Sequence, residues 1–66
     1  MSETGTFGER LRSRRKKAKL TQAEAAGRAG IGQGHWSDIE AGRASPTLDT
    51  LSKITAAIGC SLKTLV

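Results

Sequence analysis

A compact all-α domain of five helices is the fold class that this 66-residue sequence predicts. Apolar side chains recur at the three- and four-residue spacing of a helix face, and no segment has the pattern of a β-strand. Threonines before these segments and glycines after them mark where helices begin and end. Because a chain of this length buries only about 60% of its unfolded surface, we expect a single domain over residues 1–66, with residues 1–5 as a flexible tail.

The first helix is expected over residues 6–18, and the second from residue 22 until Gly30. One face of the first helix consists of Phe7, Leu11, Arg15 and Ala18. Thr21 and Glu24 have the spacing of a capping box, which predicts the start of the second helix. That helix is rich in alanine, so its backbone can pack closely on a neighbour, and a tight turn over residues 30–32 follows it.

The third helix is expected from about Gln33 to Glu40, and its two sides differ in character. One side carries Trp36, Ile39 and Glu40. The other side carries Gln33, Gly34, Ser37 and Asp38. We expect Trp36 to pack in the core rather than to stack on a base, so the second side is the one left exposed.

A glycine- and proline-containing loop over residues 41–46 leads to a fourth helix, expected over residues 48–58 with Thr47 as its N-cap. Its apolar positions at helical spacing are Leu48, Leu51, Ile54 and Ile58. Gly59 ends this helix, and Ser61 is expected to cap a fifth helical turn that carries Leu62 and Leu65.

The net charge of +5 is concentrated at one end of the chain. Residues 1–20 carry seven basic and two acidic residues, whereas residues 21–66 carry four of each. A local positive field of this kind favours phosphate backbones or anionic membranes. Cys60 is the only cysteine, no apolar run approaches the roughly 20 residues of a membrane span, and the first residues lack a signal peptide's apolar stretch, so we expect a cytoplasmic protein.

Two short helices joined by a glycine-containing turn, the second with small polar residues on its outer side, form the helix-turn-helix pattern, here over about residues 22–41. The residues also resemble a family, the Cro and repressor (XRE-like) type of helix-turn-helix found in bacterial and phage transcription regulators. The matching segments are Leu20–Ala26, Ile31, Trp36–Gly42 and Pro46–Leu51. The resemblance covers about residues 7–65 and implies a lambda-repressor-like fold that binds double-stranded DNA and regulates transcription.

The resemblance implies that the third helix is a recognition helix, which enters the major groove. The base-reading residues are then Gln33, Gly34, Ser37 and Asp38. A glutamine can pair with adenine and an acid can accept from cytosine, while Gly34 contributes no side chain, so DNA shape is expected to carry part of the specificity. Contacts to phosphates are expected from Arg14, Lys17, Gln22, Gly32, His35 and Arg43.

Two charged residues are expected in the interior, because Arg15 lies on the apolar face of the first helix and Glu40 lies beside Trp36 and Ile39. We predict that Arg15 and Glu40 form a structural ion pair, as the resemblance also implies. The family further implies a homodimer on a palindromic operator, with half-sites about one helical turn apart. The candidate dimer contacts are Leu62, Leu65 and Val66.

Other function classes are weighed against this hypothesis. The glycines at 27, 30, 32 and 34 follow no strand and lack the lysine of a nucleotide-binding loop, and His35 has no second ligand or nucleophile nearby. We therefore expect no enzyme, metal, cofactor or small-molecule ligand. A protein-interaction module such as an antitoxin and a basic membrane-surface helix stay open, and salt-dependent, sequence-dependent DNA binding would separate them from a regulator.

Overall fold

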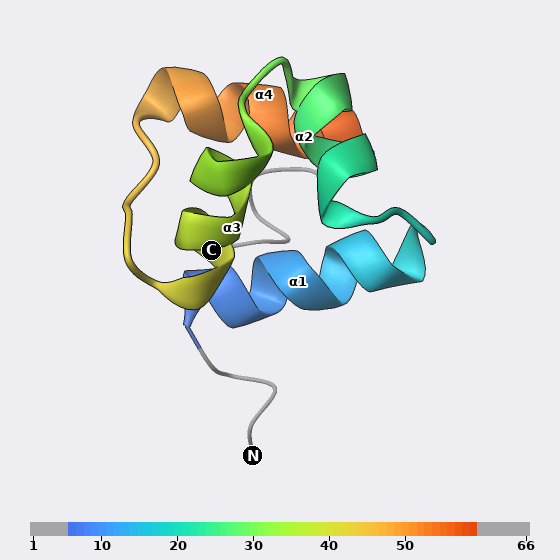
Figure 1. Cartoon of the computed structure of the whole chain (residues 1–66), viewed down its shortest axis with the longest axis horizontal. Helices are drawn as coiled ribbons and strands as arrows, with labels where there is room; N and C mark the ends of the chain where they lie inside the picture. The colour runs from blue at the N-terminus through green and yellow to red at the C-terminus, as the bar shows by residue number, and fades with distance from the viewer. Residues whose placement is uncertain (1–5, 60–66) are drawn as a thin grey trace.

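The computed structural model describes residues 6–59, which fold into four helices (Figure 1). These are α1 (Phe7–Lys17), α2 (Gln22–Ala29), α3 (Gln33–Ala41) and α4 (Leu48–Ile58). The described part of the chain contains no β-strand, so the all-α prediction is confirmed with four helices rather than five. The expected fifth helical turn around Leu62 and Leu65, and the expected tail over residues 1–5, lie outside the described residues.

Threonine side chains fix the starts of three helices. Thr21 accepts a hydrogen bond from the amide of Glu24 at 3.1 Å, and the Glu24 carboxylate accepts from the amide of Thr21 at 2.8 Å, so the predicted capping box is present. Thr6 and Glu9 form a second capping box at the start of α1, which the same T-x-x-E spacing could have predicted. Thr47 caps α4 through the amide of Thr50, as expected.

The helix ends are closed by residues with left-handed backbone conformation. After α1 this residue is Lys19, with φ of 61°, and the amide of Leu20 reaches back to the carbonyl of Arg15 at 3.2 Å. After α3 it is Gly42, with φ of 80°, and the amide of Arg43 donates to the carbonyl of Asp38 at 2.8 Å. This pattern satisfies carbonyls that the last helical turn leaves without partners.

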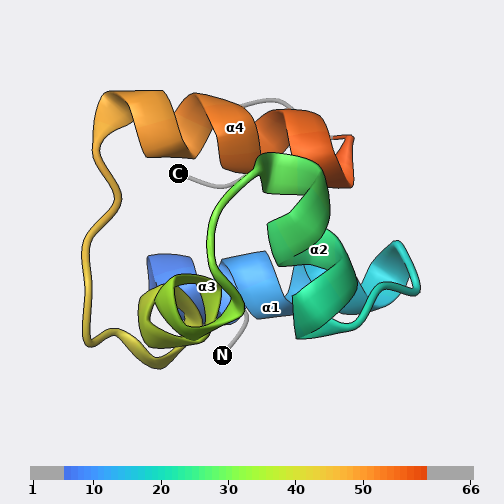
Figure 2. The ribbon, with the colours of Figure 1, turned by 45° about the horizontal axis from the view of Figure 1, so that its top comes forward.

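The helices enclose one small core. Helix α1 and helix α4 lie on opposite sides of the molecule with α2 and α3 between them (Figure 1), and α2 crosses α3 at a steep angle (Figure 2). The largest side chains with no exposed surface are Trp36, Leu11, Ile39 and Ile54. Trp36 therefore packs in the core, as predicted. Three buried alanines of α2 let it approach α3 and α4 closely.

Gly8 marks the closest approach of α1 to α3. A Cβ atom at this position would lie 2.4 Å from the carbonyl oxygen of Glu40 and 2.6 Å from that of Ile39. Only hydrogen fits there, so Gly8 allows the first turn of α1 to rest directly on the last turn of α3. The sequence does not predict this role of Gly8, because a close approach of two backbones leaves no periodic pattern.

The apolar row of α4 is only partly buried. Ile54 is fully buried, Leu51 and Ile58 are half-buried, and Leu48 is 79% exposed. Leu48 is the first residue of α4, and this end of the helix lies away from α2 (Figure 1). Among residues 6–59, no helix is both long and apolar enough to cross a membrane.

Candidate nucleic-acid interface

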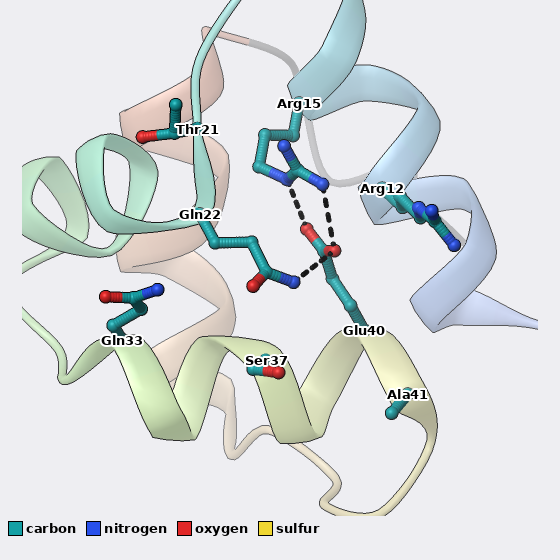
Figure 3. Close-up of a pocket in the computed structure, with 8 residues that line it drawn as sticks. All are labelled: Arg12, Arg15, Thr21, Gln22, Gln33, Ser37, Glu40 and Ala41. Carbon is teal, nitrogen blue, oxygen red and sulfur yellow. Dashed lines mark hydrogen bonds and ion pairs between the residues drawn. The ribbon is translucent and has the colours of Figure 1, made fainter.

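The carboxylate of Glu40 joins three helices at the base of the candidate interface (Figure 3). Arg15 of α1 donates to it through Nε at 2.7 Å and Nη2 at 3.2 Å, so the two residues expected to pair lie in direct contact. Gln22 of α2 donates through Nε2 at 3.0 Å, and Trp36 of α3 donates through Nε1 at 2.5 Å. Sequence reasoning identified the arginine but missed the other two donors, although Trp36 and Glu40 have the i, i+4 spacing that brings them together.

The environment of Glu40 keeps it ionised although its side chain is only 4% exposed. Burial alone would raise the pKa of this carboxyl, but hydrogen bonds from Arg15, Gln22 and Trp36 and the charge of Arg15 together hold the pKa below its ordinary value. Arg15 is also satisfied at its third nitrogen, since Nη1 donates to the carbonyl of Leu20 at 2.9 Å. The pair therefore links α3 to both α1 and the segment between α1 and α2.

An open groove lies over this network. Its lining residues are Arg12, Arg15, Thr21, Gln22, Gln33, Ser37, Glu40 and Ala41 (Figure 3). Gln33, Ser37 and Ala41 follow one another at four-residue spacing along α3, and Arg12 and Gln22 face them from α1 and α2. Two of the predicted base-reading residues, Gln33 and Ser37, thus line a groove that also contains two arginines, Arg12 and Arg15.

The remaining predicted base-reading residues, Gly34 and Asp38, lie on the side of α3 opposite the buried Ile39 and Trp36. A Cβ atom built on Gly34 meets nothing within 4 Å, so this part of the helix surface is open. The structure therefore places all four predicted base-reading residues on one continuous, accessible strip of α3, next to the groove.

Asp38 and Arg43 form an ion pair that the sequence analysis did not anticipate. Arg43 Nε and Nη2 both lie 3.1 Å from Asp38 Oδ1. The residues had been assigned separate roles, Asp38 on a base and Arg43 on a phosphate. Their contact joins the loop after α3 to the outer strip of α3 itself.

The predicted phosphate-contacting residues are only partly brought together. Arg12, which was not among the predicted contacts, lines the groove, whereas Arg14 and Lys17 do not. Positions two or five residues from Arg12 on a helix face other directions. The amide of Gln22 is held by Glu40 at the groove edge. The other candidates are exposed: Gly32 at the start of α3, His35 on its flank, and Arg43.

The start of α3 differs from the starts of the other described helices. Its N-cap is Gly32, and no side chain accepts a hydrogen bond from the first amides of the helix. These amides carry the positive end of the helix dipole, which suits a phosphate oxygen. Within residues 6–59 no three metal-ligating side chains gather, and the candidate dimer contacts Leu62, Leu65 and Val66 lie outside the described part of the chain.

Comparison with known proteins gives the same family as the motifs. A family model described as a helix-turn-helix domain matches residues 6–65. The immunity repressor protein of Bacillus phage phi105 is 36% identical over 61 residues, which make up 92% of this chain and 42% of that protein. The chain thus spans less than half the length of this curated relative.

Solved structures agree closely with the four-helix arrangement. The restriction-modification controller protein C.AhdI from Aeromonas hydrophila matches with a TM-score of 0.89 and 27% identity, covering 91% of each chain. The P22 c2 repressor, solved in complex with a synthetic operator, matches with a TM-score of 0.87 and 32% identity, covering 94% of each chain. The chain therefore belongs to the helix-turn-helix family of the Cro and repressor type, as its motifs predict.

Proposed function

We propose that this chain is a sequence-specific, double-stranded DNA-binding transcription regulator of the repressor kind, with α3 as its recognition helix. The observation that carries the proposal is the accessible strip of α3, where Gln33, Gly34, Ser37 and Asp38 lie together beside a groove bordered by Arg12. The P22 c2 repressor, a relative with the same fold, was solved bound to an operator. These relatives are described as repressors and a controller protein, which agrees with the expectation that the chain is not an enzyme.

In this proposal the strip of α3 enters the major groove, which is wide enough to admit a helix. Gln33 offers both a donor and an acceptor, the pair of groups that an adenine edge requires, and Ser37 can bond to several bases. Because Gly34 has no side chain, the backbone of α3 can come close to the base edges on the floor of the DNA major groove. Specificity would then rest on few side chains and on the shape of the DNA.

Phosphate contacts in this proposal come from groups that flank the strip. They are Arg12, the free amides after Gly32, the exposed His35 and the amide group of Gln22, with Arg14 and Lys17 adding general attraction. Arg12 replaces Arg14 as the leading basic contact of α1, because it is the arginine that borders the groove and keeps an exposed side chain.

We further propose a homodimer on a palindromic operator, as two half-sites one turn apart would match two recognition helices. The contacts expected at Leu62, Leu65 and Val66 are part of this proposal. A regulator of this kind acts where the DNA is held, which for a bacterial or phage protein is the cytoplasm. An antitoxin-like interaction module is the less favoured function, since the relatives are regulators.

Selection of bound sites from random duplex DNA, followed by footprinting and titration at several salt concentrations, tests the function. We expect one preferred sequence and an affinity that falls steeply with salt. Binding that is weak, equal on all sequences or confined to a partner protein would refute the proposal.

A matched pair of charge deletions sharpens this test. The salt slope is the slope of the logarithm of affinity against the logarithm of salt concentration. Arg12→Ala should reduce its magnitude by roughly 0.9, the value for one phosphate contact. Lys53→Ala removes the same charge from α4, where Lys53 pairs with Asp49 away from the groove, and should leave the slope unchanged. Equal effects of the two substitutions would show that only net charge matters and would remove Arg12 from the interface.

A further inference from the structure

Arg43 is tied to the outer strip of α3 at both its backbone and its side chain. Its amide donates to the carbonyl of Asp38 at 2.8 Å, as part of the turn that ends α3. Its guanidinium returns to the carboxylate of the same residue, with Nε and Nη2 each 3.1 Å from Oδ1. The backbone bond fixes where the arginine side chain begins, and the exposed ion pair orients its guanidinium toward Asp38.

The pair leaves one edge of the guanidinium available. Nε and one hydrogen of Nη2 face Asp38, so the outer hydrogens of Nη1 and Nη2 form a second, parallel pair of donors. Nη1 donates to no acceptor within residues 6–59, and the Arg43 side chain is 66% exposed. Asp38 Oδ2 likewise accepts from nothing in the described part of the chain, and the Asp38 side chain is 48% exposed.

The position of the pair favours a base over a phosphate as its target. One helical turn before Asp38, Gly34 contributes no side chain, and a Cβ atom there would meet nothing within 4 Å, so α3 is open on this side of the pair. A phosphate would be repelled by the Asp38 carboxylate beside Arg43, whereas base edges carry no net charge. The Asp38–Arg43 pair carries no net charge, so it suits the base edges on the floor of the DNA major groove better than the phosphates along its sides.

We propose that Arg43 reads a guanine in the major groove and that Asp38 is the positioning residue that aims it. Guanine presents two acceptors, O6 and N7, at the spacing that two parallel guanidinium donors fit. This assignment rests on the proposed function, and it moves Arg43 from the phosphate contacts to the reading surface.

The test uses duplex oligonucleotides carrying the site selected by the parent protein, with each guanine replaced in turn by 7-deazaguanine, which lacks the N7 acceptor. We expect that one of these replacements weakens DNA binding by the parent protein and leaves DNA binding by Arg43→Ala unchanged. Arg43→Lys keeps the charge but not the paired donors, so it should retain the salt slope and lose the preference for guanine, by roughly 5- to 150-fold at that base pair.

Asp38→Asn separates positioning from direct reading. If Asp38 acts through Arg43, Asp38→Asn should reduce the guanine preference in the parent and change nothing in the Arg43→Ala background. Circular dichroism of each variant confirms that both exposed residues can be changed without unfolding the chain. The variants are then compared on guanine and adenine versions of the same site.

The outcomes are distinct. Arg43→Ala weakening binding to all sequences equally, with no sensitivity to 7-deazaguanine, would make Arg43 a phosphate contact and overturn the inference. A guanine preference that survives in Arg43→Ala but disappears in Asp38→Asn would do the same, since Asp38 would then read the base pair itself. Failure of the parent to prefer any sequence would refute the proposed function as well.

Discussion

Replacing Gly8 by alanine should destabilise the domain, because the added methyl group has no space between α1 and α3. Its Cβ would lie 2.4 Å from the carbonyl oxygen of Glu40 and 2.8 Å from the carbonyl carbon, and ordinary contacts begin near 3.4 Å. The obstacle is backbone rather than a movable side chain, so α1 would have to shift by about 1 Å, an overpacking that costs about 1–3 kcal/mol.

Two other glycines provide matched controls. Gly27 in α2 and Gly34 in α3 also lie inside helices, and a Cβ atom on either meets nothing within 4 Å. Alanine should stabilise both positions by about 0.5–1 kcal/mol, because glycine loses more backbone entropy on helix formation. Gly8→Ala and Gly27→Ala should therefore differ by about 1.5–4 kcal/mol in the free energy of unfolding.

Thermal and urea unfolding followed by far-ultraviolet circular dichroism measures this difference. At about 4–8 °C per kcal/mol for a domain of this size, the two variants should differ by at least about 6 °C in Tm. Gly34→Ala should match Gly27→Ala in stability and differ from it in DNA binding. A Gly8→Ala protein as stable as Gly27→Ala would show that α1 and α3 do not meet as the structure places them.

Four further substitutions test the buried network and the end of α1. Glu40→Gln should lower the free energy of unfolding at pH 7 by about 3 kcal/mol, because it leaves the buried Arg15 charge without its partner. Folding lowers the pKa of Glu40, so the stability that its charged form contributes is complete above the ordinary pKa of 4.5 and is lost as the pH falls through the folded value. The difference in stability between Glu40→Gln and the parent should therefore narrow only below about pH 4.5. Trp36→Phe keeps an aromatic ring but removes the Nε1 donor to Glu40, and urea titrations should show a loss of about 1.5–3 kcal/mol. Lys19→Gly should raise the stability of the domain by about 1 kcal/mol in the same assay, because glycine adopts a left-handed conformation without strain. The control Ala18→Gly should lower it, because Ala18 has a right-handed conformation.

The helices could be predicted from sequence because their signals are local. The limits of α4 follow from Thr47 and Gly59, and the T-x-x-E spacing after Thr21 gave the start of α2. The same spacing at Thr6 was available but was not used. Helix α1 consequently begins one residue later than expected, with Thr6 outside it as the cap.

The candidate site was predictable only where one helix face determined it. Helical spacing was enough to group Gln33, Gly34, Ser37 and Asp38 on the accessible side of α3, but it could not choose among the basic residues of α1. Arg12 and Arg14 look equivalent in a basic run, and only the packing of α1 against α3 shows which one borders the groove. The Asp38–Arg43 contact could not be predicted from helical spacing, because it depends on how the chain turns at Gly42.

Glu40 connects the stability of the domain to its proposed reading of DNA. Burying a carboxylate costs more than burying an apolar residue, even when hydrogen-bond donors offset part of that cost. Fold stability alone therefore does not explain a glutamate at position 40. Its donors come from α1, α2 and α3, so the network ties α3 to the helices that carry Arg12 and Gln22. The groove is thereby held in one geometry before any ligand arrives, and a prearranged surface loses less entropy on binding. Removing the Gln22 donor should therefore weaken DNA binding more than its single contact would explain, while Arg15 and Trp36 keep the carboxylate paired and the fold intact.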